Sequence, residues 1–133
     1  MNSEQTDLDH LVDTFATEWL RLPDPQVAAR LVADPILILG PGGTMPVPRT
    51  AFLAAITARA TAVADAPGAT TTLAGTATRA LGDRMVLATI SWSFGRDAST
   101  ATLVSDFLLE REPTGGLRCV AYLPRTNVLD HLE

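Results

Sequence analysis

Apolar residues recur at helical spacing three times in the first half of the chain. They predict an amphipathic helix over about residues 7–21, a short helix that begins at Asp24-Pro25, and a third helix over about residues 49–64. Asp24 is a favourable N-cap, and a proline at the first helical position has no N–H to leave unsatisfied. Between the second and third helices, residues 36–39 form a short apolar strand, which the glycine-rich turn at 40–43 ends.

The second half of the chain has the pattern of strands joined by turns. Further strands are predicted over about residues 70–80, 84–94, 98–111 and 117–123. Consecutive hairpins of this kind form an antiparallel meander. Because the helices come first and the strands follow, we expect one α+β domain over residues 1–133, with helices on one face of a mainly antiparallel sheet.

Alternation along the predicted strands separates their side chains into two faces. In strand 84–94 the even positions are all apolar and form the expected core face: Val86, Ala88, Ile90, Trp92 and Phe94. The odd positions are less apolar, but they are not a typical solvent face. Strand 98–111 carries Leu103, Phe107 and Leu109 on one side and Val104, Asp106 and Leu108 on the other.

A second apolar row on the sheet has no helix left to cover it. Three helices cover only one face of a sheet, so an apolar row on the other face indicates a partner surface. The residues assigned to this outer face are Met85, Leu87, Leu103, Phe107, Leu109, Cys119 and Ala121. We expect a homodimer through the outer sheet face, because a two-fold contact makes one row complementary to itself.

Asp106 is an acid among apolar neighbours in the middle of a strand. Burying an unpaired carboxylate is expensive, so Asp106 either faces water, has a partner, or serves as an acid in an apolar site. A structural acid would be satisfied by Arg79, Arg118 or a backbone amide. Ion-pair networks and functional sites both perturb buried acids, so the two interpretations stay open at this point.

The charged residues exclude several kinds of chemistry. Fifteen acidic residues against ten basic ones give a net charge of −5, and all the basic residues are arginine. The absence of lysine excludes a Schiff base and a Walker-type phosphate loop. An acidic chain without an arginine cluster is not expected to bind nucleic acid. The single cysteine, Cys119, excludes an internal disulfide and a cysteine-based metal site, and no metal is expected.

The sequence also bears on where in the cell the protein is expected. Residues 1–10 are acidic and lack the basic and apolar segments of a secretory signal. No apolar run reaches the ~20 residues that a membrane span needs. We therefore expect a cytoplasmic protein without membrane contact. The last two residues, 132–133, resemble a remnant of a cloning vector.

The order of elements (long helix, short helix, short strand, third helix, long meander) resembles the nuclear transport factor 2-like superfamily over essentially the whole chain. This superfamily is also called the SnoaL-like or ketosteroid isomerase-like fold. The resemblance implies a cone-shaped, cystatin-like roll whose strongly curved sheet encloses a deep apolar pocket. The segment VSDFLLEREPTGGLRCVAY resembles the part of ketosteroid isomerases that carries a pocket aspartate, which falls on Asp106. The pocket implied around it consists of Phe15, Trp19, Ile90, Trp92, Val104, Leu108 and Tyr122.

The other catalytic groups of this superfamily have no counterpart at the matching positions. The general base of ketosteroid isomerases would follow the first strand, where this chain has Gly40-Pro41-Gly42, and their tyrosine would lie near Phe15. Relatives of limonene epoxide hydrolase need two carboxylates bridged by an arginine. Relatives of scytalone dehydratase use pocket histidines, whereas His10 and His131 are expected at the surface.

Two functions follow from the resemblance. The first is a non-catalytic, dimeric protein whose pocket binds a small apolar ligand without a cofactor. The alternative is a cofactor-free isomerase, cyclase or hydrolase that acts on a small apolar or polyketide-like substrate, with Asp106 as its acid. Proton transfer next to a ketone needs a base, so the missing base favours the first function.

Overall fold

The computed structural model describes residues 3–22, 24–40, 42–65, 68, 70–96 and 99–125. Its helices are α1 (Ser3–Trp19), α2 (Pro25–Leu31) and α3 (Arg49–Asp65). Its strands are β1 (Val32–Gly40), β2 (Gly43–Val47), β3 (Thr70–Leu81), β4 (Met85–Arg96), β5 (Ser99–Arg111) and β6 (Leu117–Pro124). The predicted α+β class is confirmed. His131 and the vector-like pair at 132–133 lie outside the described residues.

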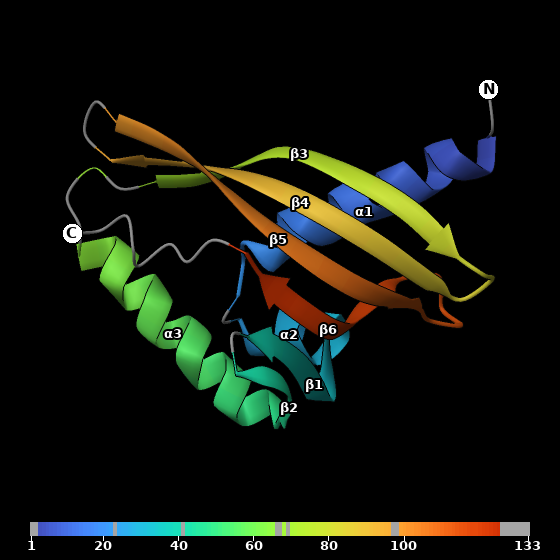
Figure 1. The fold of residues 1–133 in the computed structure, drawn as a ribbon, viewed down its shortest axis with the longest axis horizontal. Coiled ribbons are helices and arrows are strands. Elements are labelled where there is room, and N and C mark those ends of the chain that lie inside the picture. Colours follow the sequence, from blue (N-terminus) through green and yellow to red (C-terminus); the bar gives the residue numbers. More distant parts are fainter. Residues whose placement is uncertain are drawn as a thin grey trace.

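The strands form one mixed sheet in the order β2-β1-β6-β5-β4-β3 (Figure 1). Only the β1–β6 pair is parallel among the described strands, which confirms the predicted, mainly antiparallel meander. β2 was not predicted, because its five residues include Pro46 and show no alternation. Proline is tolerated there since β2 is an edge strand. Gly43, at φ +110°, supplies the turn that joins β1 to β2.

The predicted start of α2 is confirmed in atomic detail. Asp24 Oδ1 accepts hydrogen bonds from the backbone N–H groups of Gln26 and Val27, at 2.9 and 3.2 Å. Pro25 occupies the first turn, where its missing N–H costs nothing. The helix ends at Leu31, and Val32 is already extended and begins β1. This tight junction brings β1 next to β6, against which α2 packs.

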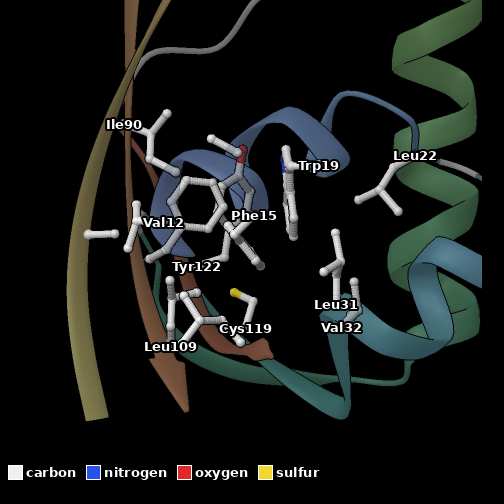
Figure 2. Packing of buried hydrophobic residues seen from close by; sticks show 14 of the residues in the cluster. Val12, Phe15, Trp19, Leu22, Leu31, Val32, Ile90, Leu109, Cys119 and Tyr122 are labelled. Atoms are coloured by element: carbon white, nitrogen blue, oxygen red, sulfur yellow. The ribbon is translucent and has the colours of Figure 1, made fainter. Parts of the chain in front are cut away.

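The core lies between α1, α2 and the inner face of the sheet. Figure 2 shows side chains of α1 and α2 facing those of the strands. Phe107 of β5 lies at the centre, with its ring centroid 4.9 Å from that of Trp19, 5.1 Å from Tyr122 and 5.6 Å from Phe15. The contacts with Trp19 and Phe15 are edge-to-face, a geometry that stabilises the core beyond the effect of the buried area alone. This aromatic cluster fixes which side of β5 faces inward.

Polar contacts hold the exposed side of α1 against the edge strand β3. The hydroxyl of Thr78 donates to Asp9, and the hydroxyl of Thr76 donates to Asp13 Oδ1 at 2.7 Å. The Thr78 hydrogen bond, with a smaller contribution from the Gln5 amide, holds the pKa of the Asp9 carboxyl below its usual range. The threonines of β3 and the acidic residues of α1 thus belong together, because the threonine hydroxyls donate hydrogen bonds to the carboxylates.

The predicted faces of β5 are reversed in the structure. Ala88 pairs with Phe107 and Thr89 pairs with Asp106, so Phe107 shares the inner face with the even positions of β4. The assignment of Leu103, Phe107, Leu109 and Cys119 to the outer face was therefore wrong, and all four are buried in the core. Met85, Leu87 and Ala121 do lie on the outer face. Both sides of β5 are apolar, so alternation alone could not decide its orientation.

Candidate functional site

A cavity of about 360 Å³ opens between α3, the C-terminal end of α1 and the inner face of strands β3 to β6. Most of its lining is aliphatic or aromatic: Trp19, Leu20, Leu22, Ile56, Ala60, Ala64, Trp92 and Leu103. The polar part of the lining consists of Arg59, Thr70, Thr71, Ser105 and Tyr122. A pocket of this size, apolar with a few polar groups, is typical of sites for small molecules.

The composition of α3 explains why the cavity exists. Phe52, near the start of the helix, packs its ring against Trp19 and Tyr122, with centroid distances of 5.8 and 5.9 Å. Further along the helix the pocket-facing residues are Ala60 and Ala64, whose side chains are too short to reach the sheet. The N-terminal part of α3 is therefore anchored to the core, whereas its C-terminal part bounds an unfilled space.

Arg59 brings a positive charge to this apolar wall. Its side chain is half-buried, and its Nη1 lies 3.5 Å from the hydroxyl oxygen of Tyr122. Among the described residues, no carboxylate forms an ion pair with it. Ser105, which is only 4% exposed, places its hydroxyl on the strand side of the same pocket.

The structure brings together only part of the pocket that the sequence implied. Trp19, Trp92 and Tyr122 line the cavity. Phe15 and Ile90 lie on the inner side as well, but they are buried in the adjoining core. Val104 and Leu108 are on the opposite face of the sheet, next to Asp106 in β5. Their predicted place in the pocket was wrong, for the same reason as the reversal of β5.

Asp106 does not lie in the cavity and has its partners on the outer face. Its Oδ1 accepts a hydrogen bond from the Thr89 hydroxyl at 2.6 Å, and its Oδ2 pairs with Arg125 directly after β6. The Asp106 side chain is 14% exposed and that of Arg125 is 56% exposed. Neither arginine considered from the sequence is the partner, since Arg118 contacts Glu112 instead. The geometry is that of a structural ion pair at the edge of solvent.

The described lining of the cavity offers no carboxylate or imidazole pair for acid–base catalysis. Among the described residues it contains no carboxylate, imidazole or thiol. Cys119 lies in the core, where burial raises the pKa of its thiol, so the thiol stays protonated at neutral pH. No three His, Cys, Asp or Glu side chains in the described ranges converge on a point where a metal could bind. None of the described helices has the length and hydropathy to cross a bilayer.

Two pocket residues escaped the sequence analysis although the sequence carries a signal for each. Arg59 lies seven residues after Phe52 and three residues after Ile56, so all three share one helix face. It is also the only charged residue between Arg49 and Asp65. Ser105 has the same parity as Leu103 and Phe107 and therefore faces inward once β5 is correctly oriented.

The chain is similar to known proteins in structure but not in sequence. No model of a protein family and no curated protein matches the sequence. A candidate ketosteroid isomerase from Shewanella frigidimarina superimposes with a TM-score of 0.63 at 13% identity, covering 86% of this chain and 90% of that one. An NTF2-like protein of unknown function from Shewanella oneidensis gives 0.60 at 15% identity, covering 90% and 97%. A ketosteroid isomerase-like protein from Erwinia carotovora atroseptica gives 0.57 at 13% identity, covering 96% and 100%.

At these identities the likeness concerns the fold alone, and it extends over nearly the full length of both chains. The shared architecture is the one that the order of elements predicted, with helices on the inner side of a mixed sheet. This chain has the nuclear transport factor 2-like fold.

Proposed function

We propose that this protein binds a small, mainly apolar molecule in the cavity beside α3, without a cofactor and without catalysing a reaction. The observation that carries the proposal is the composition of the cavity wall. Two indole rings, a phenol ring and several aliphatic side chains surround a space large enough for a compact ring system. The described lining holds no base, so the proton transfer of a ketosteroid isomerase has no agent there.

The chain carries its own reporter for this binding. Its sequence contains two tryptophans, and both Trp19 and Trp92 line the cavity. Adamantane-1-carboxamide is a suitable neutral probe, because it is compact, apolar and transparent where tryptophan is excited. We expect it to change the tryptophan emission in a saturable way, and calorimetry on the same samples measures the dissociation constant.

A matched pair of substitutions tests whether the cavity is the site. Ala60→Phe places a ring in the cavity and should abolish binding of the carboxamide. Ala58→Phe puts the same ring on α3 at an exposed position outside the lining and should leave binding unchanged. Equal binding by the Ala60→Phe variant and the unsubstituted protein would contradict the proposal.

We also propose that the outer face of the sheet joins two copies of the chain. Strand pairing aligns one apolar row across four strands of this face: Leu37, Ala121, Leu108 and Leu87. Leu37 is 39% exposed and Leu87 is 37% exposed. The next row contains Asp106, which is paired with Arg125. A two-fold axis at this face would bring the apolar rows of the two copies together, with the charge of Asp106 already neutralised within each copy.

Sedimentation equilibrium at micromolar concentration tests the dimer. Leu87→Glu should give a monomer, because it places an unpaired charge within the apolar row of the proposed contact. Met45→Glu is the matched control, since Met45 lies on β2 outside the row and is 63% exposed. A monomeric unsubstituted protein, or a dimer that survives Leu87→Glu, would contradict a contact through this face.

A further inference from the structure

The half-buried arginines of the described chain differ in how their charge is satisfied. Arg118 lies with its Nε 2.9 Å from Glu112 Oε1, and Arg49 donates from Nη1 to the backbone carbonyl of Val32 at 3.2 Å. Arg59 has the Tyr122 hydroxyl, at 3.5 Å, as its polar side-chain contact within the described residues. A guanidinium carries five N–H donors, so the described residues take up only a small part of the hydrogen-bonding capacity of Arg59.

We infer that the cavity selects ligands with a carboxylate head group, and that Arg59 is the residue that binds this group. The inference rests on the proposed binding function and adds the chemical class of the ligand. A cation that is partly removed from water and lacks a counterion is unfavourable, and a ligand carboxylate would supply the counterion. Arginine presents two parallel N–H groups that match the two oxygens of a carboxylate, which makes this pairing strong and directional.

The neighbouring polar groups suit the same head group. Tyr122 and Ser105 belong to adjacent strands, and both face the cavity from the inner side of the sheet. Phe107 pairs with Tyr122, and Ser105 lies two residues before Phe107, so the two hydroxyls are diagonal neighbours opposite Arg59. Both hydroxyls can donate a hydrogen bond to an oxygen that Arg59 holds. The carboxylate would thus be bound from the helix on one side and from the strands on the other.

The apolar part of the cavity wall determines the chemical character of the rest of the ligand. Around the polar group lie Trp19, Trp92, Leu103 and Ile56, which offer rings and aliphatic surface but no second charge. The ligand expected is therefore a monocarboxylic acid with a compact apolar body. The protein as a whole has a net charge of −5 and repels anions, so a preference for an anion has to come from a local positive group.

Two probes of the same shape separate the head group from the body. Adamantane-1-carboxylate and adamantane-1-carboxamide differ in charge and share the apolar cage. We expect the carboxylate to bind the unsubstituted protein about 10- to 100-fold more tightly, as for a charge-assisted hydrogen-bonded pair. In the Arg59→Gln variant this ratio should fall to near one. Arg79→Gln, which removes one positive charge from an exposed position outside the cavity, should keep the full ratio.

The outcomes distinguish this inference from the proposed function. If the carboxamide binds as tightly as the carboxylate, the cavity is a site for apolar molecules but the inference is wrong. If the preference persists in Arg59→Gln, another group binds the anion and the inference is also wrong. If neither probe binds at millimolar concentration, the proposed function fails and the inference fails with it.

Discussion

Two charged side chains lie in apolar surroundings on opposite faces of the sheet, and they differ in what neutralises them. On the outer face, Asp106 has a hydroxyl donor in Thr89 and a counterion in Arg125. In the cavity, Arg59 has a hydroxyl at 3.5 Å and no carboxylate within the described part of the chain. The described residues thus supply both a hydrogen-bond donor and a counterion for Asp106, but no counterion for Arg59.

This difference indicates which of the two charged groups, Asp106 or Arg59, is available to bind another molecule. A charge that is paired within the chain mainly supports the fold, because removing one partner leaves the other uncompensated. A charge that lines a cavity and has no counterion among the described residues is open to a ligand, because a few polar groups in an apolar pocket are what orient a bound molecule. In the sequence, Asp106 is the unusual residue, because it is a charge among apolar neighbours. In the structure, Arg59 is the unusual one, because it has no counterion among the described residues.

The largest effect on stability is expected from substitutions that test which side of β5 faces the core. Phe107→Ala should lower the free energy of unfolding by about 3–5 kcal/mol, since it removes a fully buried ring and leaves a cavity. Leu108→Ala, one residue along but on the half-buried outer face, should cost about 1–2 kcal/mol. Urea denaturation followed by circular dichroism measures both.

Repeating the Phe107 and Leu108 measurements at two protein concentrations separates loss of the fold from loss of a dimer, because only the latter depends on concentration. If the concentration-independent loss in free energy of unfolding were larger for Leu108→Ala than for Phe107→Ala, the assignment of the inner and outer faces of β5 would be reversed. Such a result would also return Asp106 to the inner side.

The next effect tests whether the acid on the outer face is structural. Asp106→Asn should destabilise by about 1–2 kcal/mol, because the amide keeps a contact with Thr89 but loses the ion pair. Arg125→Gln should cost less, since its side chain is 56% exposed. A double-mutant cycle should give a coupling of about 0.5–1 kcal/mol. A rise in stability of Asp106→Asn would instead indicate an acid that is strained in the native state.

The sequence predicted most of the fold because the fold depends on local signals. The N-cap at Asp24, the glycine turn before β2 and the spacing of apolar residues in the helices are each readable within a few residues. The order of helices and strands then restricts the architecture. The meander of β3 to β6 follows from the turns alone, and its predicted boundaries lie within a few residues of the observed ones.

The candidate site was harder to predict because it depends on contacts between distant residues. Whether Ser105 or Asp106 faces inward is decided by the register of β5 against β4 and by the ring contacts of Phe107, and both sides of β5 are apolar. The partner of Asp106 comes from Arg125, beyond the end of another strand. The space beside Arg59 exists only because Phe52 anchors one end of α3 while alanines line the other.

A smaller effect of opposite sign is expected in the cavity. Arg59→Met keeps a long apolar stem and removes a cation that has no counterion among the described residues, so it should stabilise the ligand-free protein by about 0.5–1 kcal/mol. Differential scanning calorimetry would show a rise in Tm of a few degrees. Arg49→Met is the control, because it breaks the hydrogen bond to the Val32 carbonyl and should lower Tm. A fall in Tm for Arg59→Met would mean that the guanidinium serves the fold, as Asp106 does.

The smallest effect compares Asp106 with Asp9, an exposed carboxylate that also binds a threonine hydroxyl but has no arginine partner among the described residues. The Thr78 hydrogen bond lowers the pKa of Asp9 in the folded state below its ordinary value of 3.8. The unfolded chain therefore binds the proton more readily, so the contribution of Asp9 to stability is present above that value and is lost as the pH falls through the folded pKa. Asp9→Asn should lower Tm slightly at neutral pH, and the gap in Tm to the unsubstituted protein should close as the pH falls below 3.8 and through the folded pKa. A gap that stays constant with pH would show that the Thr78 hydrogen bond does not favour the ionised form of Asp9, and that the charge of Asp9 does not help to hold α1 on β3.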